Sequence, residues 1–158
     1  MTESSALRIR SEFAITVHAP PEAAFALFGG YGERAWAGKD WDPQFLRPSP
    51  PEDRAGAVFL MPLAGRERLW LTTRFDRARG HVRHVYLLED SSVCVIDVRL
   101  VAKAPEETRV SVAYERTSLR PEADDDVRRL AAADAEQGPE WEAAIAAALS
   151  TARAAKPA

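Results

Sequence analysis

Side chains in the middle of the chain have the types needed for proton transfer. Thr73, His84 and Asp97 each lie in a run where apolar and polar residues alternate, as they do in half-buried strands. If short turns join these runs, the three side chains form a row on one face of a sheet. A carboxylate in such a row can hold the tautomer of an imidazole, which then acts as a general acid or base. His84 and Asp97 are therefore the candidate catalytic residues.

The same row offers a site for an anion. Arg99 lies two residues after Asp97, so both side chains point to one face of the predicted strand. A buried arginine needs an anionic partner, because an unpaired buried charge is costly. Arg99 either pairs with Asp97 or binds a carboxylate or phenolate group of a ligand.

The rest of the chain supplies the elements that position this row. The pattern predicts a strand at Arg8–Val17, a helix that begins at Pro21, and a long loop with a short helix near Glu33 to Trp36. Five more strands are predicted at 57–61, 69–76, 81–88, 93–101 and 108–117. An amphipathic helix follows, with its apolar stripe running from Val127 to Leu149 and a kink at Gly138-Pro139.

The turn lengths predict which side chains face this final helix. A turn at Arg77–Gly80 pairs Asp76 with His81, and a turn at Glu89–Ser92 pairs Leu88 with Val93. The predicted ligand-binding set lies on the concave face, in the long loop and on the final helix: Trp36, Trp41, Leu71, Thr73, Phe75, His84, Tyr86, Val95, Asp97, Arg99, Val112, Tyr114 and Trp141. A slip of one residue on the strand that contains Asp97 is the alternative. It would turn Asp97 and Arg99 outward and leave an apolar cavity.

Other residues have simpler interpretations. Asp134 interrupts the apolar stripe of the final helix and is a further possible partner for Arg99, but it is predicted to face water, because carboxylates are seldom fully buried. His81 and His84 are three residues apart on a strand and point to opposite faces, so neither a metal site nor another cofactor is predicted. The strip Cys94, Ile96, Val98 and Leu100 falls on the outer face in this register and would suit a homodimer or another protein partner.

Length and composition limit the classes of function. The chain has 158 residues, of which 46% are hydrophobic and 28% charged, which predicts one domain over 1–158 with a core of about 7–152. A net charge of −3 argues against nucleic acid as a partner. The chain has one cysteine, no run long enough to insert into a membrane, and a polar start unlike a signal peptide, so a cytoplasmic location is expected.

Three segments and the order of elements resemble the START-like, or SRPBCC, superfamily. They are Val17-His18-Ala19-Pro20-Pro21-Glu22-Ala23-Ala24-Phe25, Thr108-Arg109-Val110-Ser111-Val112-Ala113-Tyr114 and Glu140-Trp141-Glu142-Ala143-Ala144-Ile145. The resemblance implies an α+β helix-grip fold, in which a curved antiparallel sheet wraps around a long C-terminal helix and short helices lie near the N-terminus. It implies a protein that binds a small hydrophobic or aromatic molecule. Alternatives are a cyclase, dehydratase or hydrolase using His84 and Asp97, and a protein-interaction domain similar to chaperone ATPase activators.

Overall fold

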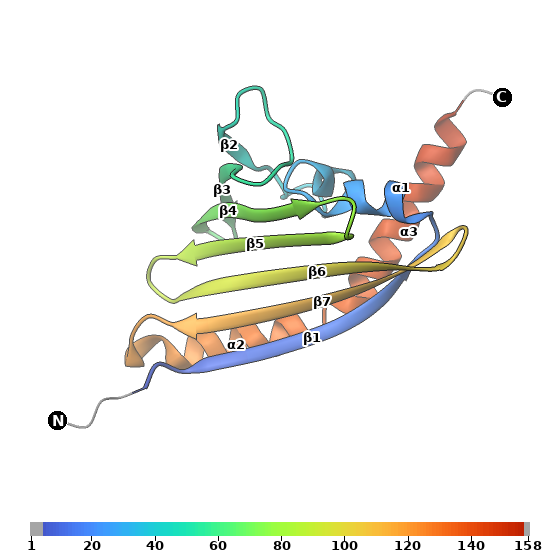
Figure 1. The fold of residues 1–158 in the computed structure, drawn as a ribbon. Helices are drawn as coiled ribbons and strands as arrows, with labels where there is room; N and C mark the ends of the chain where they lie inside the picture. Colours follow the sequence, from blue (N-terminus) through green and yellow to red (C-terminus); the bar gives the residue numbers. More distant parts are fainter. Residues whose placement is uncertain (1–4, 157–158) are drawn as a thin grey trace.

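A curved antiparallel sheet forms most of the molecule. The computed structural model describes residues 5–156, and its seven strands lie in the order β1-β7-β6-β5-β4-β3-β2 (Figure 1). The strands are β1 (Arg8–Val17), β2 (Gln44–Arg47), β3 (Val58–Leu63), β4 (Arg66–Asp76), β5 (His81–Leu88), β6 (Ser92–Ala104) and β7 (Glu107–Ser118). The predicted strands are all present. The short strand β2, inside the predicted loop, was missed because four residues show too little alternation to stand out.

Helices cover one face of this sheet. The N-terminal helices are α1 (Pro21–Phe25), η1 (Ala26–Phe28) and η2 (Gly32–Ala35), and the C-terminal ones are η3 (Pro121–Ala123), α2 (Asp124–Ala135) and α3 (Gly138–Ala155). Figure 1 shows α2 and α3 running along the β1 and β7 side of the sheet. The predicted kink at Gly138-Pro139 is a break between two helices. At this point a Cβ on Gly138 would lie 3.2 Å from the ring of Phe13. None of the helices in residues 5–156 has the length and apolar character needed to cross a membrane.

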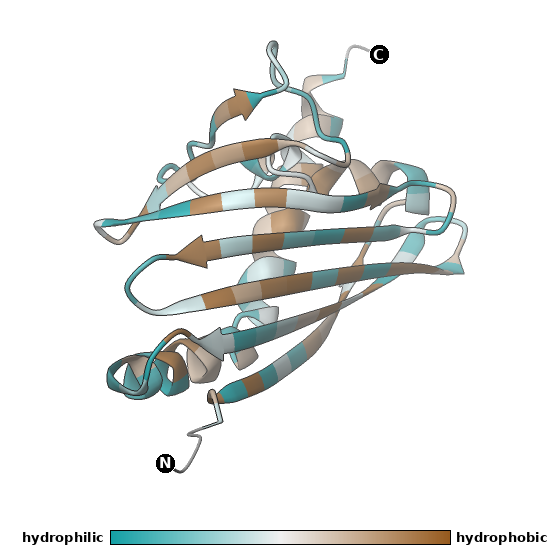
Figure 2. Cartoon of the chain, turned by 60° about the vertical axis from the view of Figure 1, so that its left-hand side comes forward, coloured by the Kyte–Doolittle hydropathy of each residue, from teal (hydrophilic) through white to brown (hydrophobic). Residues whose placement is uncertain are grey.

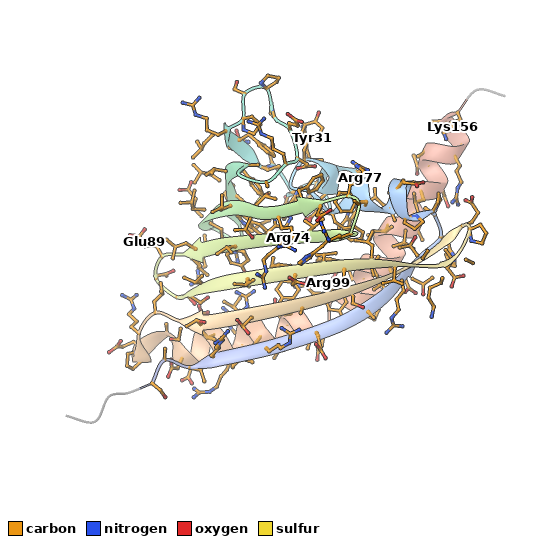
Figure 3. The ribbon with its side chains drawn as sticks, in the orientation of Figure 1. Tyr31, Arg74, Arg77, Glu89, Arg99 and Lys156 are labelled. Carbon is orange, nitrogen blue, oxygen red and sulfur yellow. The ribbon has the colours of Figure 1, made fainter. Side chains whose placement is uncertain are left out.

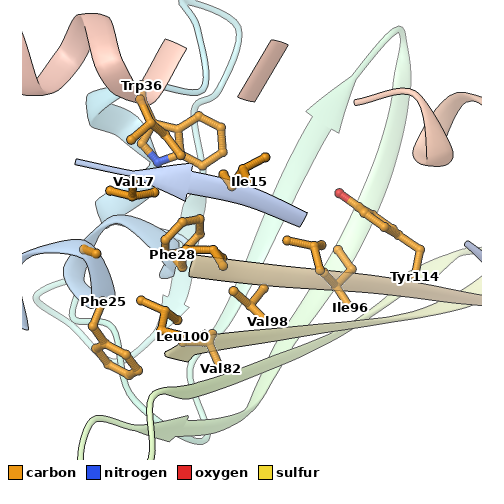
Figure 4. Packing of buried hydrophobic residues seen from close by; sticks show 14 of the residues in the cluster. Ile15, Val17, Phe25, Phe28, Trp36, Val82, Ile96, Val98, Leu100 and Tyr114 are labelled. Atoms are coloured by element: carbon orange, nitrogen blue, oxygen red, sulfur yellow. The ribbon is translucent and has the colours of Figure 1, made fainter. Parts of the chain in front are cut away.

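Alternation along the strands separates an inner face from an outer face. Figure 2 shows hydrophobic and hydrophilic bands alternating along the central strands. Val82, Ile96 and Val98 point into the core between sheet and helices, where Figure 4 shows them on one side of the sheet. His84 and Tyr86 of β5 and Val112 and Tyr114 of β7 are also buried on this side, so the inward-facing residues of these two strands were predicted correctly.

The prediction of which β6 residues face inward is wrong by one residue. The turn after β5 holds only Glu89, Asp90 and Ser91, so Leu88 pairs with Ser92 rather than with Val93. His84 consequently lies opposite Ile96, and Asp97 and Arg99 point to the outer face. The slip that was the alternative in the sequence analysis is the arrangement observed.

The strip that contains Cys94 and Ile96 is therefore part of the core. Cys94, Ile96, Val98 and Leu100 are each at most 7% exposed. The prediction that this strip docks a partner or a second copy is wrong.

In the first half of β4, the residues predicted to face inward also lie on the outer face. Asp76 pairs with His81 as predicted, but a bulge between Thr72 and Arg74 places Thr72 opposite His84. Leu71 and Thr73 therefore lie on the outer face, whereas Phe75, beyond the bulge, faces inward and contacts Phe25 at a ring distance of 4.7 Å.

Gly80 closes the turn between β4 and β5 in a conformation that suits glycine. Its φ is +59°, and a Cβ there would lie 2.6 Å from the carbonyl oxygen of Leu100. Gly80→Ala is expected to destabilise the fold by more than Gly65→Ala, which has a φ of +72° but open space around it. The Gly65 variant should lose about 1 kcal/mol from its backbone conformation alone. Urea unfolding of both variants compares the losses, and equal losses would show that the Leu100 contact has no effect.

Candidate ligand-binding site

A cavity of about 260 Å³ lies between the inner face of the sheet and helices η2, α2 and α3. All four tryptophans of the chain contribute to its wall. The lining residues are Glu33, Trp36, Ala37, Trp41, Leu63, Arg68, Trp70, His84, Tyr86, Ile96, Val98, Tyr114, Arg116, Leu130, Ala133, Asp134, Gln137, Glu140, Trp141 and Ala144. An aromatic wall with a few polar groups is the usual composition of a small-molecule site.

The predicted site residues fall into three groups. Six of them line the cavity: Trp36, Trp41, His84, Tyr86, Tyr114 and Trp141. Phe75 and Val112 face the same side of the sheet but pack into the core away from the cavity. Five lie on the outer face, where the register and the bulge turn them: Leu71, Thr73, Val95, Asp97 and Arg99.

His84 is fully engaged in hydrogen bonds. Its Nδ1 lies 3.1 Å from the hydroxyl of Thr72, and its Nε2 lies 3.1 Å from the carbonyl oxygen of Phe28. Burial lowers the pKa of His84 and favours the neutral ring. A neutral ring that donates from Nε2 and accepts at Nδ1 satisfies both neighbours, so His84 fixes η1 to the sheet.

Asp97 belongs to a charged cluster on the outer face. Its carboxylate lies 2.8 Å from Nε2 of His81 and accepts hydrogen bonds of 3.1 Å from Arg83 and Arg99. Figure 3 labels Arg99 and Arg74, and Arg74 also contacts His81. The prediction that Asp97 orients His84 is wrong, because the sheet separates them.

A buried ion pair stands at the inner wall instead. Asp134 of α2 accepts hydrogen bonds of 2.6 and 2.9 Å from Nε and Nη2 of Arg116. Both side chains are at most 4% exposed, so the prediction that Asp134 faces water is wrong. Arg116 shares the inner face of β7 with Val112 and Tyr114, which were predicted to face inward, and its need for an anion is the signal that could have pointed to Asp134.

Two hydrogen-bond donors on this wall have no partner in the described part of the chain. Nη1 of Arg116 and Nε1 of Trp70 are buried and unpaired. The indole of Trp70 stacks on the ring of Tyr86 at 4.6 Å, and the guanidinium of Arg116 lies 5.4 Å from the centre of that ring. Cys94 lies between Tyr86 and Arg116 in the sheet, where burial raises the pKa of its thiol to about 12 and keeps it protonated.

Arg68 is a second buried arginine on the cavity wall. It is 9% exposed, and Nη1 donates to the carbonyl oxygens of Leu63 and Arg66. None of the described carboxylates forms an ion pair with it. Its guanidinium lies 5.7 Å from the centre of the Tyr86 ring, so both arginines flank the same tyrosine. Arg68 and Trp70 were missed in the sequence because the bulge in β4 was not visible there.

Glu33 brings a lone carboxyl group to the opposite wall. It comes from η2, is 8% exposed, and its side chain makes no hydrogen bond with the described residues. Burial, and to a smaller extent the negative charge of Asp53, raises the pKa of Glu33 well above its usual range. The cavity therefore favours the neutral acid at this position.

Glu33→Gln is expected to stabilise the fold at neutral pH. The pKa of Glu33 is higher in the folded state than in the unfolded chain, where it is about 4.3. The wild type therefore loses stability as the pH rises above about 4.3. The gain from glutamine should be small near that pH and should grow as pH rises. Denaturant unfolding at several pH values measures it, with Glu140→Gln at an exposed position of the wall as the control. A gain that does not change with pH would contradict the account.

A wider depression of about 570 Å³ lies on the outer face of the sheet. It is lined mainly by charged residues, among them Arg10, Arg83, Asp97 and Arg99. Several of these charges are paired with one another, as Arg83 and Arg99 are with Asp97. The inner cavity is the better candidate for a ligand-binding site, because its aromatic wall carries buried hydrogen-bond donors that lack partners among the described residues.

Comparison with solved structures identifies the fold. Norcoclaurine synthase from Thalictrum flavum, in complex with dopamine and hydroxybenzaldehyde, has a TM-score of 0.67 at 14% identity, over 98% of this chain and 91% of that one. The ZhuI aromatase/cyclase from Streptomyces sp. R1128 has a TM-score of 0.66 at 18% identity, over 96% of this chain and 100% of the other. Ara h 8.0201 has a TM-score of 0.62 at 14% identity, over 91% and 99%.

The chain has the helix-grip fold that these three proteins share, as the order of its elements indicated. No family model matches the sequence, and no curated protein matches it. The identities are low enough that the likeness establishes the fold alone. Function has to be argued from the residues of the cavity.

Proposed function

We propose that this protein binds a small aromatic molecule in the cavity between the sheet and helices α2 and α3. The observation that carries the proposal is the aromatic wall with buried polar groups that lack partners. Such groups are costly in an empty site and are compensated when a ligand supplies the missing hydrogen bonds. The synthase that shares the fold was crystallised with two small aromatic compounds, which is consistent with this use of the fold.

The cavity volume limits the size of the ligand. An apolar cavity of about 150 Å³ holds benzene. A cavity of about 260 Å³ therefore suits a molecule of one or two rings. Larger ligands would require η2 or α3 to move.

Nondenaturing mass spectrometry of the protein purified from its own host tests this function. We expect an extra small mass that is lost when the same sample is denatured. Trp70→Ala should reduce the occupancy, and Arg99→Ala, on the outer face, should not. The proposal fails if no added mass appears and a panel of one-ring and two-ring aromatics produces no change in tryptophan fluorescence.

The cavity also favours a second candidate function, which is proton transfer by Glu33. A buried carboxyl with a raised pKa is a common general acid or base. This replaces the predicted pair His84 and Asp97. Once a ligand is known, Glu33→Gln should abolish its conversion and retain its binding, and unchanged turnover would exclude Glu33 from catalysis.

A further inference from the structure

We propose that the ligand carries one anionic oxygen group, a carboxylate or an acidic phenolate, on an aromatic body, and that Arg68 and Arg116 bind this group. The inference rests on the proposed function, because it concerns the same cavity. It specifies the chemical class of the ligand and the residues that select it.

The charge of the cavity wall favours an anionic ligand. Arg116 is neutralised by Asp134, whereas Arg68 is buried and has only carbonyl oxygens as partners among the described residues. The other two acids of the wall do not compensate Arg68: the carboxyl of Glu33 is buried, unpaired within residues 5–156 and held toward the neutral form, and Glu140 is exposed and forms no ion pair with Arg68. One positive charge therefore remains in a place where water is largely excluded. A buried guanidinium in this situation is stabilised by an anion.

The hydrogen-bond donors of the cavity wall also favour an anion. Nη1 of Arg116 has no partner, and the guanidinium of Arg68 uses only Nη1 in its hydrogen bonds. Both guanidinium groups lie within 6 Å of the centre of the Tyr86 ring, at 5.4 and 5.7 Å. Nε1 of Trp70, which stacks on that ring, is unpaired as well. Each oxygen of an anionic group accepts charge-assisted hydrogen bonds, so an anion in this part of the cavity is a better partner for these donors than a neutral group is.

The aromatic part of the cavity wall indicates the body of the ligand. The cavity wall also carries the indoles of Trp36, Trp41 and Trp141 and apolar side chains of β6, α2 and α3. This surface suits an aromatic ring or two. The neutral carboxyl of Glu33 can donate a hydrogen bond to a second oxygen of the ligand.

Matched pairs of probes test the charge of the ligand. Titration calorimetry is run with two pairs of compounds, 2-naphthoate with 2-naphthamide and the smaller benzoate with benzamide. The two members of each pair have nearly the same shape, but only the carboxylate is charged. We expect the carboxylate of at least one pair to bind the wild type about tenfold more tightly than its amide, or better.

Two arginine variants locate the source of this preference. Arg68→Met keeps the length and apolar stem of the side chain, and it should bring the carboxylate and its amide to within about threefold of each other. Arg83→Met removes the same charge from the outer face and should leave the ratio unchanged. If Arg68→Met does not fold, Arg68→Lys retains the charge and should retain the preference for the carboxylate.

The outcomes separate this inference from the proposed function. Equal affinity for carboxylate and amide in the wild type, or binding only of uncharged aromatics, would overturn the inference and leave the cavity as a binding site. A preference that survives in Arg68→Met would remove Arg68 from the site. If none of the probes binds and no other aromatic does, the proposed function itself has failed.

Discussion

Asp134→Ala is expected to lower the free energy of unfolding by about 3–5 kcal/mol, because it leaves the buried guanidinium of Arg116 without its anion. Arg116 is 3% exposed and cannot reach water to recover the loss. Urea unfolding monitored by circular dichroism measures the change. The loss should be larger than for any removal of a single exposed charge in this protein.

Asp125→Ala is the matched control for this prediction. Asp125 lies on the same helix and contacts Arg128 at 2.8 Å, but its side chain is 97% exposed. Its removal should cost less than about 1 kcal/mol. The double variant Arg116→Met with Asp134→Leu should recover most of the loss, because an apolar pair avoids the desolvation of two charges. A loss below about 1 kcal/mol for Asp134→Ala would show that the ion pair is not buried in solution.

Ala144→Phe is expected to abolish ligand binding while the protein stays folded. Ala144 lies on α3 and faces the cavity, so a phenyl ring at this position occupies the space that the ligand would use. We expect the affinity of any cavity ligand to fall by about tenfold or more. Overpacking should cost about 1–3 kcal/mol of stability, which calorimetric unfolding can verify.

Ala146→Phe controls for the size of the new side chain. Ala146 is exposed on the same helix and does not line the cavity. The affinity of the Ala146→Phe variant for the ligand should equal that of the wild type. If Ala144→Phe binds as well as Ala146→Phe does, the ligand lies elsewhere.

The order of the elements was predictable because each depends on a local pattern. Alternation identified the six longer strands, and the proline at the start of α1 and the Gly138-Pro139 break followed from backbone chemistry. The fold class followed from this order together with the family motifs. These features need no knowledge of which residues pair across the sheet.

The site was less predictable, because it depends on register. A turn one residue shorter than expected and a bulge in β4 turned Asp97, Arg99, Thr73 and Leu71 outward and Trp70 inward. The inward residues of β7 were nevertheless predicted correctly, because the register between β6 and β7 was also off by one. A six-residue link over 102–107 would pair Val101 with Thr108, whereas Val101 pairs with Arg109. The two errors cancel. A polar residue such as Arg68 on the inner face breaks the apolar pattern, so alternation alone assigns it to the wrong side.

The sequence did contain one usable signal for the charged wall. Arg116 was on the predicted inner face, and an inward arginine requires a carboxylate within reach. Asp134 on the apolar stripe of the facing helix was the available partner. Asp134 was instead predicted to face water, because buried carboxylates are rare. Its pairing with Arg116 depends on how α2 packs over β7, which the sequence alone does not show.

The indole N–H signals of the four tryptophans give the most direct test that the inner cavity binds the ligand. All four side chains line the cavity, and two of them already donate to carbonyl oxygens, Trp36 to Leu27 and Trp41 to Gly30. In a proton–nitrogen NMR titration with an aromatic ligand, the account predicts shifts of these signals, largest for Trp70, whose N–H has no partner in the described part of the chain. Unchanged indole signals together with shifted backbone amides of Arg83, Asp97 and Arg99 would place the ligand on the outer face and contradict the account.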